Sequence, residues 1–156
     1  METTKNKTTL LIMAAGMGSR FGSLKQLALL GPHKKTLLHY SIYDAVHAGF
    51  DKIVFIIRRS FENEFKEAVG KYAESLVETV YCFQEMDQLP GNLPPIQREK
   101  PWGTAHAIWA AKDHIHEPFI AINADDFYGR DAFVKMHDFV ASNTDERCFS
   151  LAGYRL

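Results

Sequence analysis

Glycines and cations gather in one short stretch of the sequence, Ala14 to Gln26, directly after an apolar run. Gly16 and Gly18 would let backbone N–H groups approach an anion closely, because glycine has no Cβ and adopts turn conformations freely. Arg20 and Lys25 follow and add positive charge, the first as a planar fork and the second as a point charge. This composition predicts a phosphate-binding loop, although the glycine spacing alone is equally typical of a tight turn.

Two common phosphate-binding motifs do not fit this stretch. The dinucleotide-binding fingerprint requires a third glycine at the position of Phe21. The Walker A motif requires Gly-Lys-Ser/Thr after four spacer residues, and the stretch has no such run. A dinucleotide-dependent dehydrogenase is therefore disfavoured.

Short apolar runs alternate with amphipathic stretches along the chain. Strands are expected at Thr9–Ala14, Lys52–Ile57, Val77–Phe83, Phe119–Ile122 and Cys148–Tyr154. Helices are expected from Thr36 to Ala48, Ser60 to Ala73, Gly103 to Ile115 and Asp131 to Ser142. This alternation predicts an α/β protein, a three-layer αβα sandwich with a mostly parallel sheet and right-handed crossovers.

The loops that follow the strands are the first places to look for a ligand, because such sheets bind ligands outside the carboxyl ends of their strands. The loops after Ala14, Phe83 and Ile122 are therefore candidate sites. Asp125, just past the last of these strands, can face the crevice, whereas its neighbour Asp126 points to the opposite side if the chain stays extended.

Composition excludes several classes of protein. The 156 residues are 46% hydrophobic and 24% charged, which is typical of one globular domain. The 18 lysines and arginines nearly balance the 19 aspartates and glutamates, so no nucleic-acid partner is expected. The sequence has no apolar run of about 18 residues, so no membrane span is expected. Cys82 and Cys148 match no metal or redox motif, and both are expected to be buried strand residues of a protein in the reducing cytoplasm.

Three motifs, in order and each near a predicted strand end, resemble the signature of the nucleotidyltransferase superfamily that activates sugar phosphates and related alcohol phosphates. Ala14–Arg20 matches its Ala-Ala-Gly-x-Gly-Ser/Thr-Arg, and Lys25–Leu27 matches a following Lys-Gln-Leu. Pro101–Ala105 resembles its Pro-x-Gly-Thr/Leu-Ala, and Ile122–Gly129 resembles its strand-end Gly-Asp-Asn-x-Phe-Tyr-Gly. The resemblance implies a Rossmann-like, nucleotide-diphospho-sugar transferase-like fold. It also implies transfer of a nucleoside monophosphate from a nucleoside triphosphate to a sugar 1-phosphate, with release of pyrophosphate.

The resemblance further implies a role for each site residue. The nucleotide-binding residues would be Ala14, Ala15, Gly16, Gly18, Ser19, Gln84, Gly103 and Thr104. Arg20 and Lys25 would be catalytic, by neutralising charge on the phosphates, and Asp125 would hold Mg²⁺ with Asp126 in support. This fits Mg²⁺, which usually takes one or two carboxylates together with substrate phosphates. His106, on one face of the Gly103 helix, is expected to be structural.

Other interpretations remain open. A cytidylyltransferase for a polyol phosphate also carries Lys-Gln after its glycine loop, and a nucleotide-binding module without turnover would show the same motifs. Members of the superfamily usually continue well past the position where this chain stops. Residues 1–156 are therefore expected to form a single nucleotidyltransferase domain, truncated at its C-terminus. A terminal strand would leave an open sheet edge, which favours a homodimer.

Overall fold

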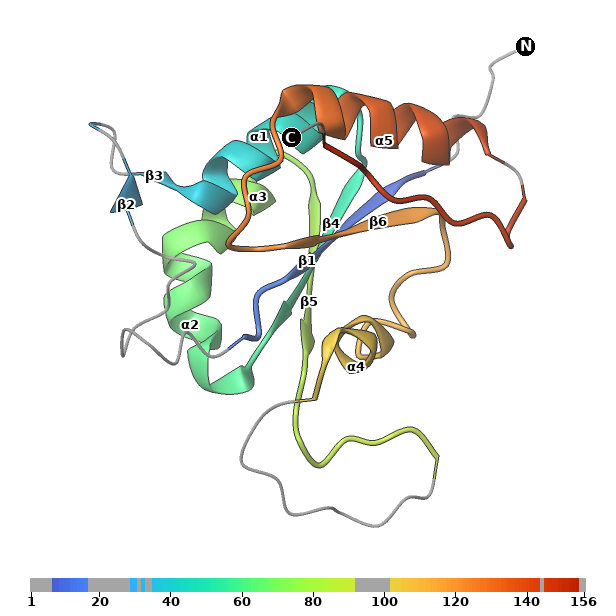
Figure 1. Cartoon of the computed structure of the whole chain (residues 1–156). Coiled ribbons are helices and arrows are strands. Elements are labelled where there is room, and N and C mark those ends of the chain that lie inside the picture. Colours follow the sequence, from blue (N-terminus) through green and yellow to red (C-terminus); the bar gives the residue numbers. More distant parts are fainter. Residues whose placement is uncertain are drawn as a thin grey trace.

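The computed structural model of the chain describes residues 7–16, 29–30, 32, 35–91, 102–143 and 145–154. Its centre is a four-stranded sheet in the order β5-β4-β1-β6, and all three pairings are parallel (Figure 1). The strands are β1 (Thr9–Met13), β4 (Lys52–Ile57), β5 (Glu78–Phe83) and β6 (Phe119–Asn123). The chain passes from β1 to β4 and β5 and then returns to the other side of β1. The strand order therefore reverses between β1 and β6, which is where open α/β sheets bind ligands.

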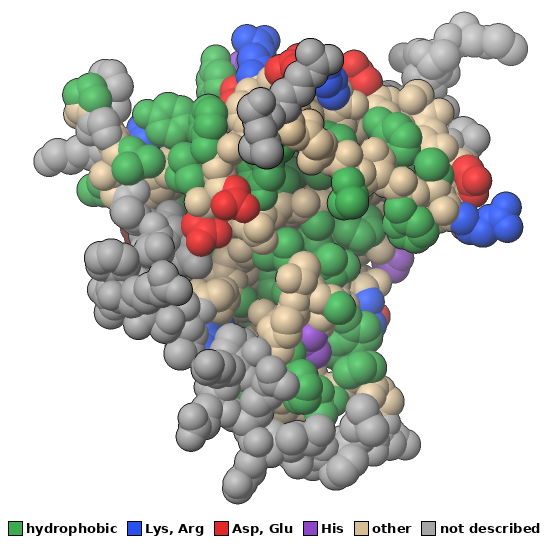
Figure 2. All heavy atoms as spheres, in the orientation of Figure 1, with side chains coloured by type: hydrophobic (Ala, Val, Ile, Leu, Met, Phe, Trp, Pro, Cys, Tyr) green, Lys and Arg blue, Asp and Glu red, His purple; other side chains and the backbone are tan. Residues whose placement is uncertain are grey.

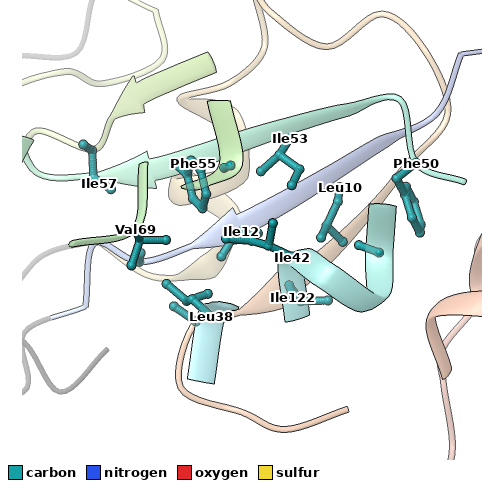
Figure 3. Packing of buried hydrophobic residues seen from close by; sticks show 14 of the residues in the cluster. Leu10, Ile12, Leu38, Ile42, Phe50, Ile53, Phe55, Ile57, Val69 and Ile122 are labelled. Atoms are coloured by element: carbon teal, nitrogen blue, oxygen red, sulfur yellow. The ribbon is translucent and has the colours of Figure 1, made fainter. Parts of the chain in front are cut away.

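Helices cover both faces of this sheet, so the expected three-layer sandwich is confirmed. On one face, Leu10 and Ile12 of β1 pack in one cluster with residues of α1 (Leu37–Ala48) and α5 (Arg130–Ser142) (Figure 3). On the other face, Leu11 packs with the short helix α4 (Thr104–Trp109). Successive side chains of a strand point to opposite faces, so a continuous apolar run such as β1 supplies both cores.

Helix α1 begins and ends where its sequence predicts. The backbone N–H of Thr36, the residue before the helix, donates to His39 Nδ1 at 3.2 Å. Gly49 ends the helix with φ 112°, a left-handed conformation that glycine adopts without a Cβ clash. Before this helix, Leu29–Leu30 (β2) and Lys35–Thr36 (β3) form a small antiparallel pair, which was not among the expected strands.

The segment between β4 and β5 is helical, as expected, but it is not one regular helix that Ser60 caps. It runs through a 3₁₀ turn, η2 (Arg59–Phe61), a short helix, α2 (Glu62–Phe65), a π turn, η3 (Lys66–Gly70), and a second short helix, α3 (Lys71–Glu74). Gly70 lies against β5, where a Cβ would sit 2.2 Å from the Tyr81 hydroxyl oxygen. The Tyr81 hydroxyl in turn donates to Glu74 Oε1 at 2.7 Å.

Two further predictions about secondary structure are wrong. The segment expected to be a strand, Cys148–Tyr154, has no strand structure, and it leaves Phe149 91% and Leu151 97% exposed. Cys148 is exposed as well, whereas Cys82 in β5 is buried as expected. Helix α4 ends at Trp109, and only turns continue toward Ile115. None of the helices that the structure describes has the length and apolarity needed to cross a membrane.

Candidate functional site

The carboxyl ends of β1 and β6 lie side by side, and they place the first and third sequence motifs together. The strand register pairs Met13 with Asn123. One residue further, the backbone N–H of Ala124 donates to the Met13 carbonyl oxygen at 3.1 Å. Asp125 follows immediately and is exposed. Asp125, just past the end of β6, therefore lies close to the start of the glycine-rich stretch.

The start of that stretch is well anchored. The N–H of Ala14 donates to Ile56 O of β4 at 2.8 Å, and Ala14 and Ala15 are both buried. Gly16 comes next and is exposed. The remaining predicted residues of the loop, Gly18, Ser19, Arg20 and Lys25, lie outside the described residues.

The two neighbouring aspartates have different surroundings. Asp126 accepts hydrogen bonds from Asn123 Nδ2 at 2.8 Å and from the Tyr128 hydroxyl at 3.3 Å. The Tyr128 hydroxyl oxygen also accepts the backbone N–H of Asn123 at 2.9 Å, and burial raises the pKa of this tyrosine. Within the described residues, no side chain pairs with the Asp125 carboxylate. Sequence reasoning missed Asn123 and Tyr128 as the residues that hold Asp126, although both lie inside the third motif.

Gln84 and the start of α4 form a second part of the candidate site, at the carboxyl end of β5. Gln84 directly follows β5, is only 6% exposed, and donates its Nε2 to Trp102 O at 2.8 Å. Gly103 and Thr104 begin α4 and are exposed, with open space where a Gly103 Cβ would lie. Trp102 Nε1 donates to Met86 O at 3.0 Å, so the chain after β5 is attached to the chain before α4. The sequence analysis did not predict this contact of Trp102.

The described residues contain no group of three or more His, Cys, Asp or Glu side chains arranged to hold a metal ion. Asp125 and Asp126 are both exposed at the end of β6, and Asp126 is the one held by hydrogen bonds from described side chains. His114 and His116 lie past α4, where the backbone oxygen of His114 accepts from Lys52 Nζ at 2.5 Å. That contact lies at the amino end of β4, away from the edge described above.

Comparison with known proteins gives consistent results. The sequence model of the family described as "Nucleotidyl transferase" matches residues 9–154. UTP–glucose-1-phosphate uridylyltransferase of Bacillus subtilis (strain 168) is 28% identical over 130 residues, which are 74% of this chain. The bifunctional protein GlmU of Staphylococcus haemolyticus (strain JCSC1435) is 30% identical over 107 residues, which are 69% of this chain. The crystal structure of a UDP-glucose pyrophosphorylase complexed with UDP-glucose has a TM-score of 0.57 and 23% identity over 85% of this chain, which supports the fold.

The chain is shorter than these proteins. It spans 43% of the B. subtilis relative, 19% of the S. haemolyticus relative and 53% of the crystallised pyrophosphorylase. The family match nevertheless covers nearly all of the chain, from β1 past the end of α5. The chain therefore belongs to the nucleotidyl transferase family.

Proposed function

We propose that this chain forms the nucleotide-binding part of an enzyme that transfers a nucleoside monophosphate from a nucleoside triphosphate to a sugar 1-phosphate. The observation that carries the proposal is the hydrogen bond from Ala124 to Met13, which sets Asp125 beside the start of the glycine-rich loop. A triphosphate is commonly bound by backbone donors, cations and a metal ion held by a carboxylate, and these motifs would supply the donors, the cations and the carboxylate.

The proposed reaction needs little from the protein besides position and charge. A phosphate oxygen of the sugar 1-phosphate, which is already an anion at neutral pH, forms a bond to the α-phosphorus. The bond between that phosphorus and the bridging oxygen breaks, and pyrophosphate leaves with the electron pair. No general base is required, so catalysis consists of positioning and charge stabilisation. Gly16, Gly18 and Ser19 would hold the triphosphate while Arg20 and Lys25 neutralise its charge.

A Mg²⁺ ion fits the residues at this edge. Asp125 is exposed and unpaired among the described side chains, whereas Asp126 is engaged by Asn123 and Tyr128. One carboxylate with substrate phosphates and water is an ordinary ligand set for this ion. Asp125 would therefore hold the ion, and Asp126 would keep the turn after β6 in shape. When bound, the ion supplies positive charge next to the phosphates.

A pyrophosphate-release screen tests the reaction. Four nucleoside triphosphates are crossed with a set of sugar 1-phosphates and polyol phosphates, so the same panel detects a cytidylyltransferase. We expect release with at least one pair, and a loss of at least ~10²-fold in Arg20→Ala, by analogy with the loss of one electrostatic donor. Arg147→Ala is the matched control, because the Arg147 side chain is 93% exposed and lies outside the predicted site. Equal release by the Arg20 variant and the control would refute the role of Arg20.

A second candidate function is nucleotide binding without turnover. It requires only the residues that would bind the nucleotide, and this chain carries the motifs that contain them. This function predicts Mg²⁺-dependent thermal stabilisation by a nucleoside triphosphate without pyrophosphate release from any acceptor. Pyrophosphate release by the purified chain would exclude it.

A homodimer is also part of the proposal. Within the described residues β6 is paired on one side only, and Phe119 on it is exposed. Hydrophobic side chains gather below α5 on the face shown in Figure 2, and Phe149 and Leu151 are almost fully exposed in the segment after that helix. An unpaired strand edge beside exposed apolar residues favours self-association. Light scattering that gives the mass of a monomer would exclude the dimer.

The proposed setting is the reducing cytoplasm. Cys82 and Cys148 are both free thiols, one buried and one exposed. A protein with an exposed free thiol and no disulfide among its described residues suits a compartment that keeps thiols reduced.

A further inference from the structure

The imidazole of His106 connects the buried amide of Gln84 to the chain that follows β5. Gln84 Nε2 lies 3.3 Å from His106 Nδ1, and His106 Nε2 lies 2.5 Å from the backbone oxygen of Gln88. The ring of His106 also packs beside two indoles, with centroids 6.0 Å from Trp102 and 5.5 Å from Trp109. The ring is therefore held in position by two polar contacts and two aromatic neighbours.

These contacts determine which ring nitrogen of His106 carries the proton. The backbone oxygen of Gln88 can only accept a hydrogen bond, so His106 Nε2 must be the protonated nitrogen. In the neutral imidazole Nδ1 is then bare, and it accepts a hydrogen from the amide of Gln84.

The orientation of the Gln84 amide follows from the same reasoning. Its Nε2 faces the carbonyl oxygens of Trp102 and Gly103, at 2.8 and 3.4 Å, and a flipped amide would set oxygen against these oxygens. The two hydrogens of Nε2 are thus used by the backbone before α4 and by His106. No donor from the described part of the chain reaches Oε1, which remains as the polar atom of Gln84 for a ligand.

We propose that His106 is a positioning residue of the nucleotide site, which holds the Gln84 amide so that its Oε1 meets the base. This inference rests on the proposed function, because it requires a nucleotide base at Gln84. It adds to that function the prediction that the bound base presents an N–H donor to Gln84 Oε1. His106 itself acts only through Gln84.

Two substitutions of His106 distinguish its contact with Gln84 from its contact with Gln88 in the chain after β5. In His106→Asn, the side-chain oxygen takes the place of Nδ1 and still accepts from Gln84, while the contact with Gln88 is lost. In His106→Gln, the side-chain amide reaches the place of Nε2 and still donates to Gln88, while the acceptor for Gln84 is lost. The two variants therefore keep one contact each.

The measurement is the Kd of each of the four nucleoside triphosphates with Mg²⁺, determined by calorimetry on the full 156-residue chain. For the triphosphate that binds most tightly, His106→Asn should stay within about twofold of the wild type. His106→Gln should bind about tenfold more weakly, which corresponds to one lost hydrogen bond. The reverse order, or equal affinity of all three proteins, would overturn the inference.

NMR of the ligand-free chain tests the arrangement without a nucleotide and without a variant that must fold. The ¹⁵N shifts of His106 should show a protonated Nε2, and the side-chain NH₂ of Gln84 should exchange slowly with water. A protonated Nδ1 would overturn the inference.

If the wild type binds none of the four triphosphates, the proposed function fails and this inference fails with it. If the wild type binds and His106→Gln binds equally well, only this inference fails.

Discussion

The backbone N–H of Ala124 donates to the carbonyl oxygen of Met13 at 3.1 Å, which extends the pairing with β1 by one residue past the end of β6. Because of this bond, Asp125 leaves the sheet next to the chain that leads into Gly16. Its neighbour Asp126 turns to Asn123 and Tyr128 instead. Two adjacent carboxylates of equal charge thus have different surroundings, and this difference can be tested by substitution.

Asp125→Asn should abolish the part of nucleotide affinity that depends on Mg²⁺, because a neutral amide is a poor ligand for a hard cation. We expect the Kd of the triphosphate with Mg²⁺ to rise at least about tenfold, as for the loss of a charged contact. Thermal stability in the absence of nucleotide should change little, because this side chain is exposed and unpaired among the described residues. Calorimetric titration with and without Mg²⁺ measures the effect.

Asp126→Asn is the matched control for that experiment. It should lower the melting temperature, because the amide cannot accept from both Asn123 and Tyr128 as well as the carboxylate does. Its Mg²⁺-dependent affinity should fall much less than that of Asp125→Asn. The opposite ranking of the two variants would assign the metal ion to Asp126.

A cluster of Thr9, Lys52 and Glu117 at the amino ends of the strands predicts a loss of stability in acid. Glu117 accepts from Thr9 Oγ1 and pairs with Lys52 Nζ at 2.9 Å. Burial raises the pKa of Glu117, but hydrogen bonds from Thr9, Lys52 and the backbone of His116 outweigh burial and lower it to about 2, from an ordinary value of 4.5. A depressed pKa in the folded state stabilises the protein above about pH 4.5, and this contribution is lost as the pH falls toward 2.

Glu117→Gln measures this contribution. At pH 7 it should reduce the free energy of unfolding by about 2–3 kcal/mol, between the values for surface and buried ion pairs, because Lys52 loses its partner. Urea melts should show that the difference in free energy of unfolding between this variant and the wild type shrinks as the pH falls from 5 to 2. Glu64→Gln, on the exposed side of α2, should show no such convergence. A constant difference across this pH range would contradict the role of Glu117.

The contact between Gly70 and Tyr81 predicts that a methyl group is not tolerated in the π turn. Gly70→Ala should lower the free energy of unfolding by about 1–3 kcal/mol through overpacking, despite the higher helix propensity of alanine. In a Tyr81→Phe background, which lacks the hydroxyl oxygen, the same substitution should cost less. Equal costs in both backgrounds, measured by urea unfolding, would show that this contact is unimportant.

Much of the fold was predictable because the central strands are continuous apolar runs. Lys52–Ile57 is buried throughout, and this pattern indicates a strand with neighbours on both sides and helices on both faces. The segment after α5 was not predictable in the same way. Its β-prone residues Phe149 and Leu151 indicate a strand, but a strand requires a paired neighbour, and the segment contacts the protein near β6 through a hydrogen bond from the Tyr154 hydroxyl to Tyr128 O.

Candidate site residues could be proposed from the sequence only where a motif of neighbouring residues contains them. Motifs at strand ends led to Asp125 and Gln84, because parallel strands bring their carboxyl ends to one edge. The contacts of His106 with Gln84 and Gln88 join residues that are distant in sequence, and no periodic pattern encodes them. The close approach of Gly70 to Tyr81, which lies in a later strand, is likewise not encoded by a local pattern. The roles of Arg20 and Lys25 stay predictions.

The most direct test of the nucleotide site is paramagnetic broadening by Mn²⁺, which replaces Mg²⁺ at carboxylate and phosphate ligands. Mn²⁺ with a nucleoside triphosphate is titrated into the ¹⁵N-labelled chain, and backbone amide signals are recorded. The signals of Gly16, Ala124 and Asp125 should broaden first, while those of Thr8 and Glu117, at the amino ends of the strands, persist. Broadening at Thr8 and Glu117 instead, or no broadening at Gly16 and Asp125, would contradict the proposed nucleotide site.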